Sequence, residues 1–205
     1  VSHAHATQIV MDGQRAVGVR YSINGVPHEV RARKEVILSG GAFGSPQLLM
    51  LSGIGPALHL QDMGIPVVHE LPGVGQNLQD HVTTVLIYKT PKIKDAMGFS
   101  LRGTWYMLKA MWEWRTQRTG WITSNVSETQ GFVSTEGNSA YPNIQLALCT
   151  GIVDDHARKM HWGHGFTLHV TLMRPKSRGS LSLASRNPME KPLIDPAFFK
   201  DKADL

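Results

Sequence analysis

The chain has 205 residues, of which 41% are hydrophobic and 18% are charged, a composition typical of a folded globular chain rather than a disordered one. No apolar run approaches the roughly 20 residues of a membrane-spanning helix, and the first residues lack the basic start and apolar core of a signal peptide. Cys149 is the single cysteine, so neither a disulfide nor a cysteine-based metal site is predicted. The net charge of +5 comes from scattered residues, so no nucleic-acid partner is predicted.

Three short strands are predicted at the beginning of the chain, over residues 6–11, 16–22 and 26–33. Asp12-Gly13 and Asn24-Gly25 separate them, and both dipeptides favour tight hairpin turns. A small antiparallel meander is therefore expected.

The next stretch predicts a strand, a tight turn and a helix. Val36-Ile37-Leu38 is typical of a strand that is buried on both faces, and Gly40-Gly41 follows it directly. Ser45-Pro46 indicates the start of a helix, with serine as the cap and proline in the first turn, and Gly53 indicates its end. This order favours an open α/β sheet that binds a nucleotide at its strand ends. The alternative is a glycine-rich turn without a ligand.

A short helix is predicted over residues 56–63, an extended segment over 65–68 and a loop over 72–75. The polar residues 77–81 are expected to satisfy the backbone of that loop. Residues 82–88 predict a further strand.

Two runs of sequence resemble the glucose–methanol–choline oxidoreductases, which are FAD-dependent enzymes that oxidise alcohols. The first is Gly41-Ala-Phe-Gly-Ser-Pro-Gln-Leu-Leu-Met-Leu-Ser-Gly-Ile-Gly55, and the second is Pro72-Gly-Val-Gly-Gln-Asn-Leu-Gln-Asp-His81. The resemblance implies that the backbone near Ala6 and the turn formed by Ser39, Gly40 and Gly41 lie close to FAD. For Ala6, the alternative is an ordinary strand residue.

Residues 101–118 predict the clearest helix of the chain. Leu101, Trp105, Leu108 and Trp112 recur at spacings of four, three and four, which places them in one apolar stripe. This stripe is expected to pack on its own domain, where it could wall a substrate pocket. A tryptophan-rich basic helix that lies on a membrane surface is the alternative.

The rest of the chain predicts a second, mostly antiparallel sheet. Its strands are expected within 120–132, over 143–148 and 166–173, and over 179–183 as the second strand of a hairpin with 166–173. Residues 174–185 and 192–196 again resemble the family, at the start of its C-terminal region. The predicted fold is thus mixed α/β: residues 1–90 form part of a Rossmann-like FAD-binding domain, and residues 91–205 form part of a substrate-binding domain.

Few residues are candidates for chemistry. The resemblance implies that Glu128 presents a carboxylate to the substrate, with a structurally paired glutamate as the alternative, and His161 is expected near the pocket. His156, His161, His164 and His169 match no compact zinc motif, so no metal is predicted. Ser45 and Ser52 lie in no Gly-x-Ser-x-Gly turn and are rejected as nucleophiles.

Two features of the family are not found in the sequence. There is no Gly-x-Gly-x-x-Gly turn for a pyrophosphate, and the family's catalytic histidine is expected beyond Leu205, so no catalytic residue is assigned. The chain is therefore expected to be an interior piece of a longer enzyme, inactive alone.

The predicted function is hydride transfer from a primary alcohol, choline or aliphatic, to FAD. The alternative is a non-catalytic basic binding module. A cytoplasmic location is expected, with peripheral membrane association left open, as are the alcohol and the electron acceptor.

Overall fold

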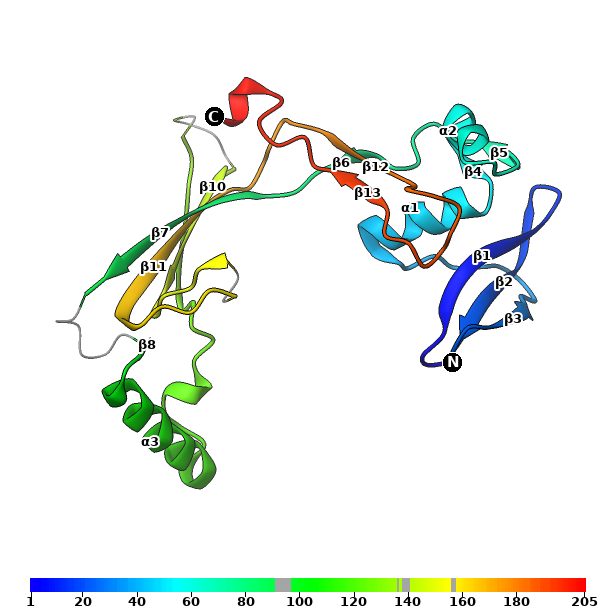
Figure 1. Ribbon diagram of the computed structural model, residues 1–205. Helices are drawn as coiled ribbons and strands as arrows, with labels where there is room; N and C mark the ends of the chain where they lie inside the picture. Colours follow the sequence, from blue (N-terminus) through cyan, green and yellow to red (C-terminus); the bar gives the residue numbers. More distant parts are fainter. Residues whose placement is uncertain (91–96, 136, 138–140, 156–157) are drawn as a thin grey trace. The chain divides into compact units, whose positions relative to one another are not determined.

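The computed structural model describes residues 1–90, 97–135, 137, 141–155 and 158–205 (Figure 1). The chain forms two compact units. Unit 1 contains Val1–Asp80 and Lys176–Leu205, and unit 2 contains His81–Pro175. The sequence predicted a division at residue 90, whereas the units divide at residue 80 and again at residue 175. The roles predicted for two domains, binding of FAD and of substrate, stay predictions.

Unit 1 begins with the expected antiparallel meander of β1 (His5–Asp12), β2 (Arg15–Ile23) and β3 (Val26–Arg31), in the order β1-β2-β3. Asn24 and Gly25 have φ angles of 50° and 82°, the left-handed pair that a type I′ hairpin requires. The dipeptide signal therefore predicted this turn correctly.

The segment before helix α1 corrects the prediction of a buried strand. Residues 35–40 form no strand in the described structure, and the side chain of Ile37 is 77% exposed. A strand exists only where a neighbouring strand completes its backbone hydrogen bonds. No described strand pairs with Val36–Leu38, so the apolar run alone does not form one.

Helix α1 (Gly41–Leu51) begins five residues earlier than predicted. Gly40 is its cap residue and Pro46 lies inside the helix. The hydroxyl of Ser45 accepts a hydrogen bond from the backbone N–H of Gly40 at 3.0 Å, so this serine holds the first turn from within the helix. Gly53 follows the helix with a φ of 83°, as expected for a residue that ends it.

The other elements of unit 1 are short, and most of its core residues come from α1 and the segments around α2. They are β4 (Ile54–Gly55), α2 (Ala57–Asp62), β5 (His69–Glu70), β6 (Gln76–Leu78), β12 (Gly179–Ser182), β13 (Leu193–Asp195) and η3 (Lys202–Asp204). β4 and β5 pair in parallel, and the order of the third sheet is β13-β12-β6.

The core cluster contains Met50, Leu51, Leu60, Ile65, Val74, Leu181 and Leu183. Burial of such side chains contributes about 1.5–3 kcal/mol each, and this cluster fixes α1 against the loop before β6.

The pairing of β12 differs from the sequence prediction. The strand at 179–183 was expected to form a hairpin with 166–173, but β12 pairs with β13 and β6 in unit 1. The hydrogen bond from the N–H of Leu181 to the carbonyl of Gly75 spans over 100 residues of sequence. Local alternation of side chains carries no information about such a distant partner.

Unit 2 is built on the predicted antiparallel sheet. It contains β7 (Val82–Lys89), β8 (Gly98–Phe99), β9 (Thr129–Val133), β10 (Ile144–Cys149) and β11 (Gly163–Leu172). The order is β7-β11-β10-β9, and β8 pairs with the beginning of β11 (Figure 1). The long central strand β11 therefore pairs with β7 and β10 along most of its length.

Helix α3 (Leu101–Gln117) occurs where the periodicity predicted it. The hydroxyl of Ser100 caps it by accepting a hydrogen bond from the N–H of Gly103 at 2.9 Å, and Arg118 ends it in the left-handed conformation. A short 3₁₀ helix, η1 (Trp121–Thr123), follows. The expected packing of the stripe is wrong for the described structure: Trp105 and Trp112 are 68% and 70% exposed, while the buried residues are Gly103 and Ala110.

Candidate functional site

The first turn of α1 presents backbone donors next to a small pocket. In any α-helix the first N–H groups have no carbonyl partner within the helix, and the helix dipole places partial positive charge there. The first turn of α1 contains no acidic residue that would compete for these donors. Such a terminus suits a phosphate or another anion when a cavity adjoins it.

A pocket of about 190 Å³ lies beside this turn and brings together two of the predicted cofactor residues, Ala6 and Gly40. Gly44, Leu48 and Leu51 line it from α1. Ala6 belongs to β1, so the meander and the helix both contribute to the same cavity. The two predicted positions therefore line one cavity, and the binding of FAD there stays a prediction.

Two hydrogen bonds fix a distant segment at the edge of this pocket. The ring of His5 bonds to the carbonyl oxygen of Pro188 at 2.9 Å, and the amide of Gln47 donates to the carbonyl oxygen of Glu190 at 2.8 Å. Pro188 itself lines the pocket. Sequence reasoning missed Gln47 and Pro188, because no local pattern links residues over 140 positions apart.

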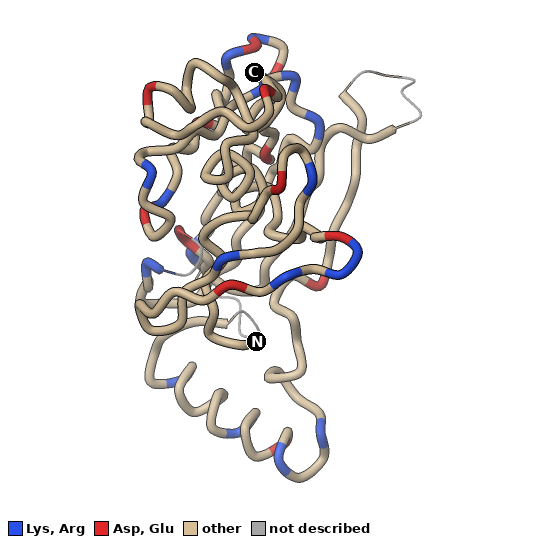
Figure 2. The backbone as a smooth tube through the Cα atoms, turned by 90° about the vertical axis from the view of Figure 1, so that its right-hand side faces the viewer, with Lys and Arg blue, Asp and Glu red and all other residues tan. Residues whose placement is uncertain are grey.

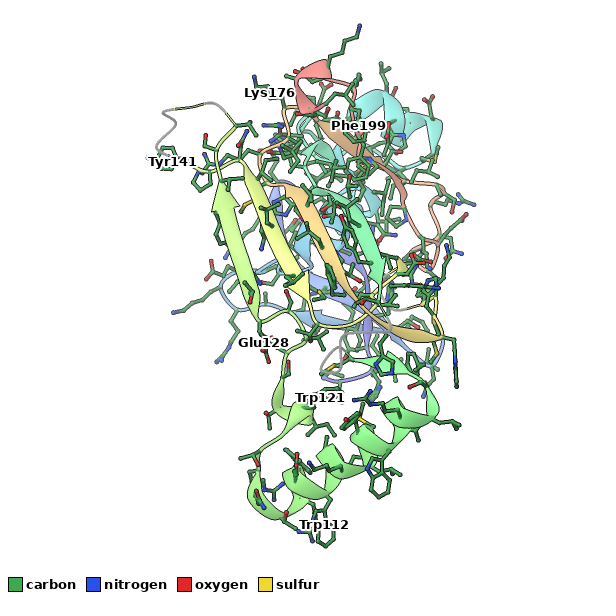
Figure 3. All side chains as sticks on the ribbon, turned by 90° about the vertical axis from the view of Figure 1, so that its left-hand side faces the viewer. Trp112, Trp121, Glu128, Tyr141, Lys176 and Phe199 are labelled. Atoms are coloured by element: carbon green, nitrogen blue, oxygen red, sulfur yellow. The ribbon has the colours of Figure 1, made fainter. Side chains whose placement is uncertain are left out.

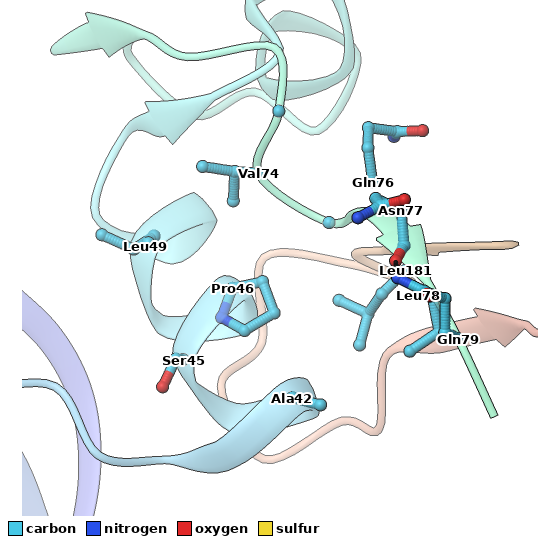
Figure 4. Close-up of a pocket in the computed structure, with 12 residues that line it drawn as sticks. Ala42, Ser45, Pro46, Leu49, Val74, Gln76, Asn77, Leu78, Gln79 and Leu181 are labelled. Carbon is cyan, nitrogen blue, oxygen red and sulfur yellow. Dashed lines mark hydrogen bonds between the residues drawn. The ribbon is translucent and has the colours of Figure 1, made fainter. Parts of the chain in front are cut away.

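A second, larger pocket of about 440 Å³ adjoins the opposite face of α1 (Figure 4). Ala42, Ser45, Pro46 and Leu49 line it, and their spacing of three, one and three places them on one side of the helix. The remaining lining residues belong to the loop 73–79 and to β12. They are Gly73, Val74, Gly75, Gln76, Asn77, Leu78, Gln79 and Leu181. The cavity thus joins the two sequence runs that carry the family resemblance.

Gly75 allows the loop to approach β12 closely. A Cβ atom at this position would lie 2.1 Å from the carbonyl oxygen of Leu181, and its φ angle is 78°. The N–H of Leu181 donates to the carbonyl of Gly75. No larger residue fits here, so this glycine shapes the wall of the second pocket.

Ser39 and Gly41 lie on either side of Gly40 and are exposed. Gly41 has a φ angle of 73°, and a Cβ atom there would meet nothing within 4 Å. The requirement for glycine at this position is therefore conformational rather than steric in the described structure.

Glu128 is exposed and directly precedes β9, at the end of the sheet where that strand begins (Figure 3). Its neighbour Thr129 pairs with Leu148 near the end of β10. Because β10 is antiparallel to both neighbours, this is also the end at which β11 begins. The loop before β11, which contains His161, therefore leaves the same end of the sheet.

His161 forms an ion-pair-like contact with Asp154. Its Nε2 atom lies 2.7 Å from Oδ2 of Asp154, and the two side chains are 29% and 28% exposed. The hydrogen bond from His161 holds the pKa of Asp154 below its ordinary value, with a smaller contribution from the charge of Lys159. The carboxylate orients the imidazole ring, which leaves Nδ1 as the atom that a ligand could meet.

Two further findings bear on the site. Among the described residues, no group of three or more His, Cys, Asp or Glu side chains gathers as a metal site would need. Within the same residues, no helix has the length and apolar character to span a bilayer.

Comparison with known proteins finds one matching family model and similar sequences. Residues 1–83 match the family model described as GMC oxidoreductase. An alcohol dehydrogenase (acceptor) from Pseudomonas putida is 42% identical over 211 residues, which cover 100% of this chain and 37% of that protein. The mitochondrial choline dehydrogenase of Homo sapiens is 41% identical over 201 residues, which cover 97% of this chain and 33% of that protein. The chain thus spans about a third of the length of these relatives.

Solved structures with a fold similar to that of this chain include the following two. A formate oxidase has a TM-score of 0.85 at 26% identity, over 98% of this chain and 40% of the other. An FAD-dependent oxidoreductase from Chaetomium thermophilum has a TM-score of 0.84 at 25% identity, over 100% of this chain and 41% of the other.

Proposed function

The chain belongs to the GMC oxidoreductase family, and we propose that it is part of an FAD-dependent enzyme that oxidises the CH–OH group of a small alcohol. The relatives named alcohol dehydrogenase and choline dehydrogenase support this reaction class. The observation that carries the proposal is the pocket shared by Ala6, Gly40 and α1.

The residues of this pocket suit part of a dinucleotide. Ala6 carries only a methyl group, so the ligand can approach the backbone there. Gly40 also lines the pocket, and a Cβ atom at this position would lie 2.9 Å from the backbone nitrogen of Ser45, so glycine allows the tight turn into α1. The free N–H groups at the start of α1 would donate hydrogen bonds to phosphate or flavin oxygen atoms. FAD, when bound, would supply the acceptor for the hydride that leaves the alcohol carbon. Ser39 and Gly41 complete the cofactor residues that we propose.

Two side chains of unit 2, Glu128 and His161, are the groups that we propose contact the substrate. Glu128 presents an exposed carboxylate at one end of the unit 2 sheet, where it can pair with a cationic alcohol such as choline. His161, held by Asp154 at 2.7 Å, would donate or accept a hydrogen bond at the alcohol oxygen. If the substrate is an uncharged aliphatic alcohol, Glu128 has no charge to match.

The test uses the full-length enzyme that contains this chain. Its visible spectrum is recorded after purification, and then under anaerobic conditions after addition of choline or a primary aliphatic alcohol. A flavin band that bleaches with one of these alcohols is the expected result. Loss of colour on desalting, or a flavin band that no alcohol bleaches, would contradict the proposal, and the first outcome would favour the non-catalytic binding module.

A further inference from the structure

The smaller pocket at α1 has one wall that comes from the C-terminal part of unit 1. Strands β12 and β13 pair as a hairpin, with Ser182 opposite Leu193. The loop between these two strands contains Pro188, which lines the pocket. We call residues 185–190 of this loop the wall segment.

The wall segment is a turn closed by its own hydrogen bonds, but neither burial nor charge fixes it in the described structure. The N–H of Asn187 donates to the hydroxyl of Ser185 at 3.0 Å, and the N–H of Glu190 donates to the carbonyl oxygen of Asn187 at 3.1 Å. Met189, its largest apolar residue, is 65% exposed. Its charged residues are Arg186 and Glu190, in a trace on which Figure 2 colours the charged positions, and no ion pair joins either of them to another described residue. Hydrogen bonds from neighbouring elements therefore hold the segment at the pocket.

His5 on β1 and Gln47 on α1 supply these hydrogen bonds. Nε2 of His5 lies 2.9 Å from the carbonyl oxygen of Pro188, and Nε2 of Gln47 lies 2.8 Å from that of Glu190. A carbonyl oxygen can only accept, so the imidazole carries a proton on Nε2 and the amide turns its NH₂ group toward Glu190. A substitution that removes either donor therefore removes the bond.

The same two residues line the pocket, so they connect its wall to the elements that form the rest of it. Gln47 follows Gly44 by three positions and precedes Leu51 by four, which places these three lining residues on one face of α1. His5 lines the pocket next to Ala6 on β1. Both α1 and β1 thus contribute a lining side chain that also bonds to the wall segment.

We propose that Gln47 and His5 are positioning residues that hold the wall segment against the pocket, and that retention of FAD depends on them. This inference rests on the proposed function, because it takes the pocket to receive part of FAD. A bound group that lies between α1, β1 and the wall segment leaves faster when that segment opens more often. Loss of either hydrogen bond should therefore raise the rate of flavin release, since weakened binding appears mainly as faster dissociation.

The test measures flavin release from the full-length holoenzyme, by the fluorescence of the free flavin after dilution. Gln47→Met keeps the length of the side chain and removes its donor, and His5→Phe keeps a ring and removes its donor. Each should release the flavin about fivefold faster, the effect expected for the loss of one hydrogen bond. His5→Gln offers an amide donor in place of Nε2 and should restore slow release. Gln61→Met is the matched control, because Gln61 is an exposed glutamine of helix α2 in the same unit.

Amide hydrogen exchange gives a second readout that does not depend on the flavin signal. The backbone N–H groups of Asn187 and Glu190 should exchange faster in Gln47→Met than in the unsubstituted enzyme, whereas those of helix α2 should not change. This measurement detects the loosened wall segment directly.

Three outcomes would overturn the inference. Gln47→Met and His5→Phe could release flavin no faster than Gln61→Met while exchange in the wall segment rises, as expected if a part of the enzyme outside this chain fills the pocket. Unchanged exchange in Gln47→Met would show that Gln47 does not hold the segment. An unsubstituted enzyme that contains no flavin would contradict the proposed function, and this inference with it, whereas the first two outcomes leave the proposed function intact.

Discussion

The hydroxyl of Ser52 accepts a hydrogen bond from the backbone N–H of Ile9 at 2.7 Å, which joins the end of helix α1 to strand β1. The same hydroxyl donates to the carbonyl oxygen of Leu48 at 2.6 Å. Ser52 is 3% exposed and Ile9 5% exposed. Because β1 carries Ala6 and the start of α1 adjoins Gly40, this buried contact helps to hold the two walls of the smaller pocket together.

Replacement of Ser52 by alanine should destabilise the full-length enzyme by about 1–3 kcal/mol, since the N–H of Ile9 would remain buried without a partner. Urea unfolding measures the change. Ser127→Ala is the matched control: its Oγ atom is buried and has no hydrogen-bond partner in the described structure, so its removal should be neutral or stabilising. Equal losses in the two variants would show that the contact between Ser52 and Ile9 contributes nothing specific.

Gly41→Val should lower the flavin content of the purified enzyme. Gly41 has a φ angle of 73° with open space beside it, so valine would strain the backbone or move the turn that adjoins the proposed cofactor pocket. Gly64→Val is the control, because Gly64 has a φ of 67° and equally open surroundings but follows helix α2, whereas Gly41 adjoins Gly40, which lines the smaller pocket. Flavin absorbance per protein should fall only for Gly41→Val. If both variants keep full occupancy, the turn at Gly41 does not adjoin the cofactor.

Local signals in the sequence predicted the elements that local chemistry determines. Asn24-Gly25 encodes its own left-handed turn, and the stripe periodicity of Trp105 and Trp112 encodes the helix α3. Neither signal identifies the element against which the turn or the helix packs. Periodicity shows that a helix has an apolar face, whereas in the described structure the small residues Gly103 and Ala110 provide the packed face.

Elements that depend on distant residues were not predictable in the same way. Val36–Leu38 has the composition of a buried strand, but a strand also needs a hydrogen-bonded neighbour, and the described structure provides none. Likewise, Pro188 and Leu181 enter the two pockets at α1 from the end of the chain. For the site, glycine composition and family resemblance pointed to Ala6 and Gly40, which do share a pocket, while the roles of Glu128 and His161 stay predictions.

Glu128→Gln should lower kcat/KM for choline at least tenfold, or about 1.4 kcal/mol, if the substrate is cationic, because glutamine keeps the volume and removes the charge. The flavin content should not change. Steady-state kinetics with choline and with a neutral primary alcohol separate charge recognition from a general defect. Glu70→Gln is the control, since Glu70 is also exposed but lies in unit 1. Unchanged kinetics with choline would exclude Glu128 as the partner of a cationic substrate. An uncharged aliphatic alcohol would then remain as the proposed substrate.

The contact between Asp154 and His161 gives a prediction about pH. The hydrogen bond from His161 is the largest cause that lowers the pKa of Asp154 from its ordinary value of 3.8, and the charge of Lys159 adds to it. His161→Phe should therefore raise the pKa of this carboxyl group toward its ordinary value, and Lys159→Gln should raise it less. Titration of the ¹³C-labelled aspartate carboxyl signals by NMR measures both shifts.

The sign of the effect on stability follows from proton binding. A carboxyl group whose pKa is lower in the folded state binds fewer protons there than in the unfolded chain, so it stabilises the fold at pH values above 3.8. This contribution disappears as the pH falls from 3.8 through the lowered pKa of the folded state. The unsubstituted enzyme should thus lose more stability than His161→Phe in this acid range, whereas near neutral pH the variant should be the less stable of the two. A carboxyl signal that titrates at the same pH in both proteins would show that His161 does not hold Asp154 in its charged form.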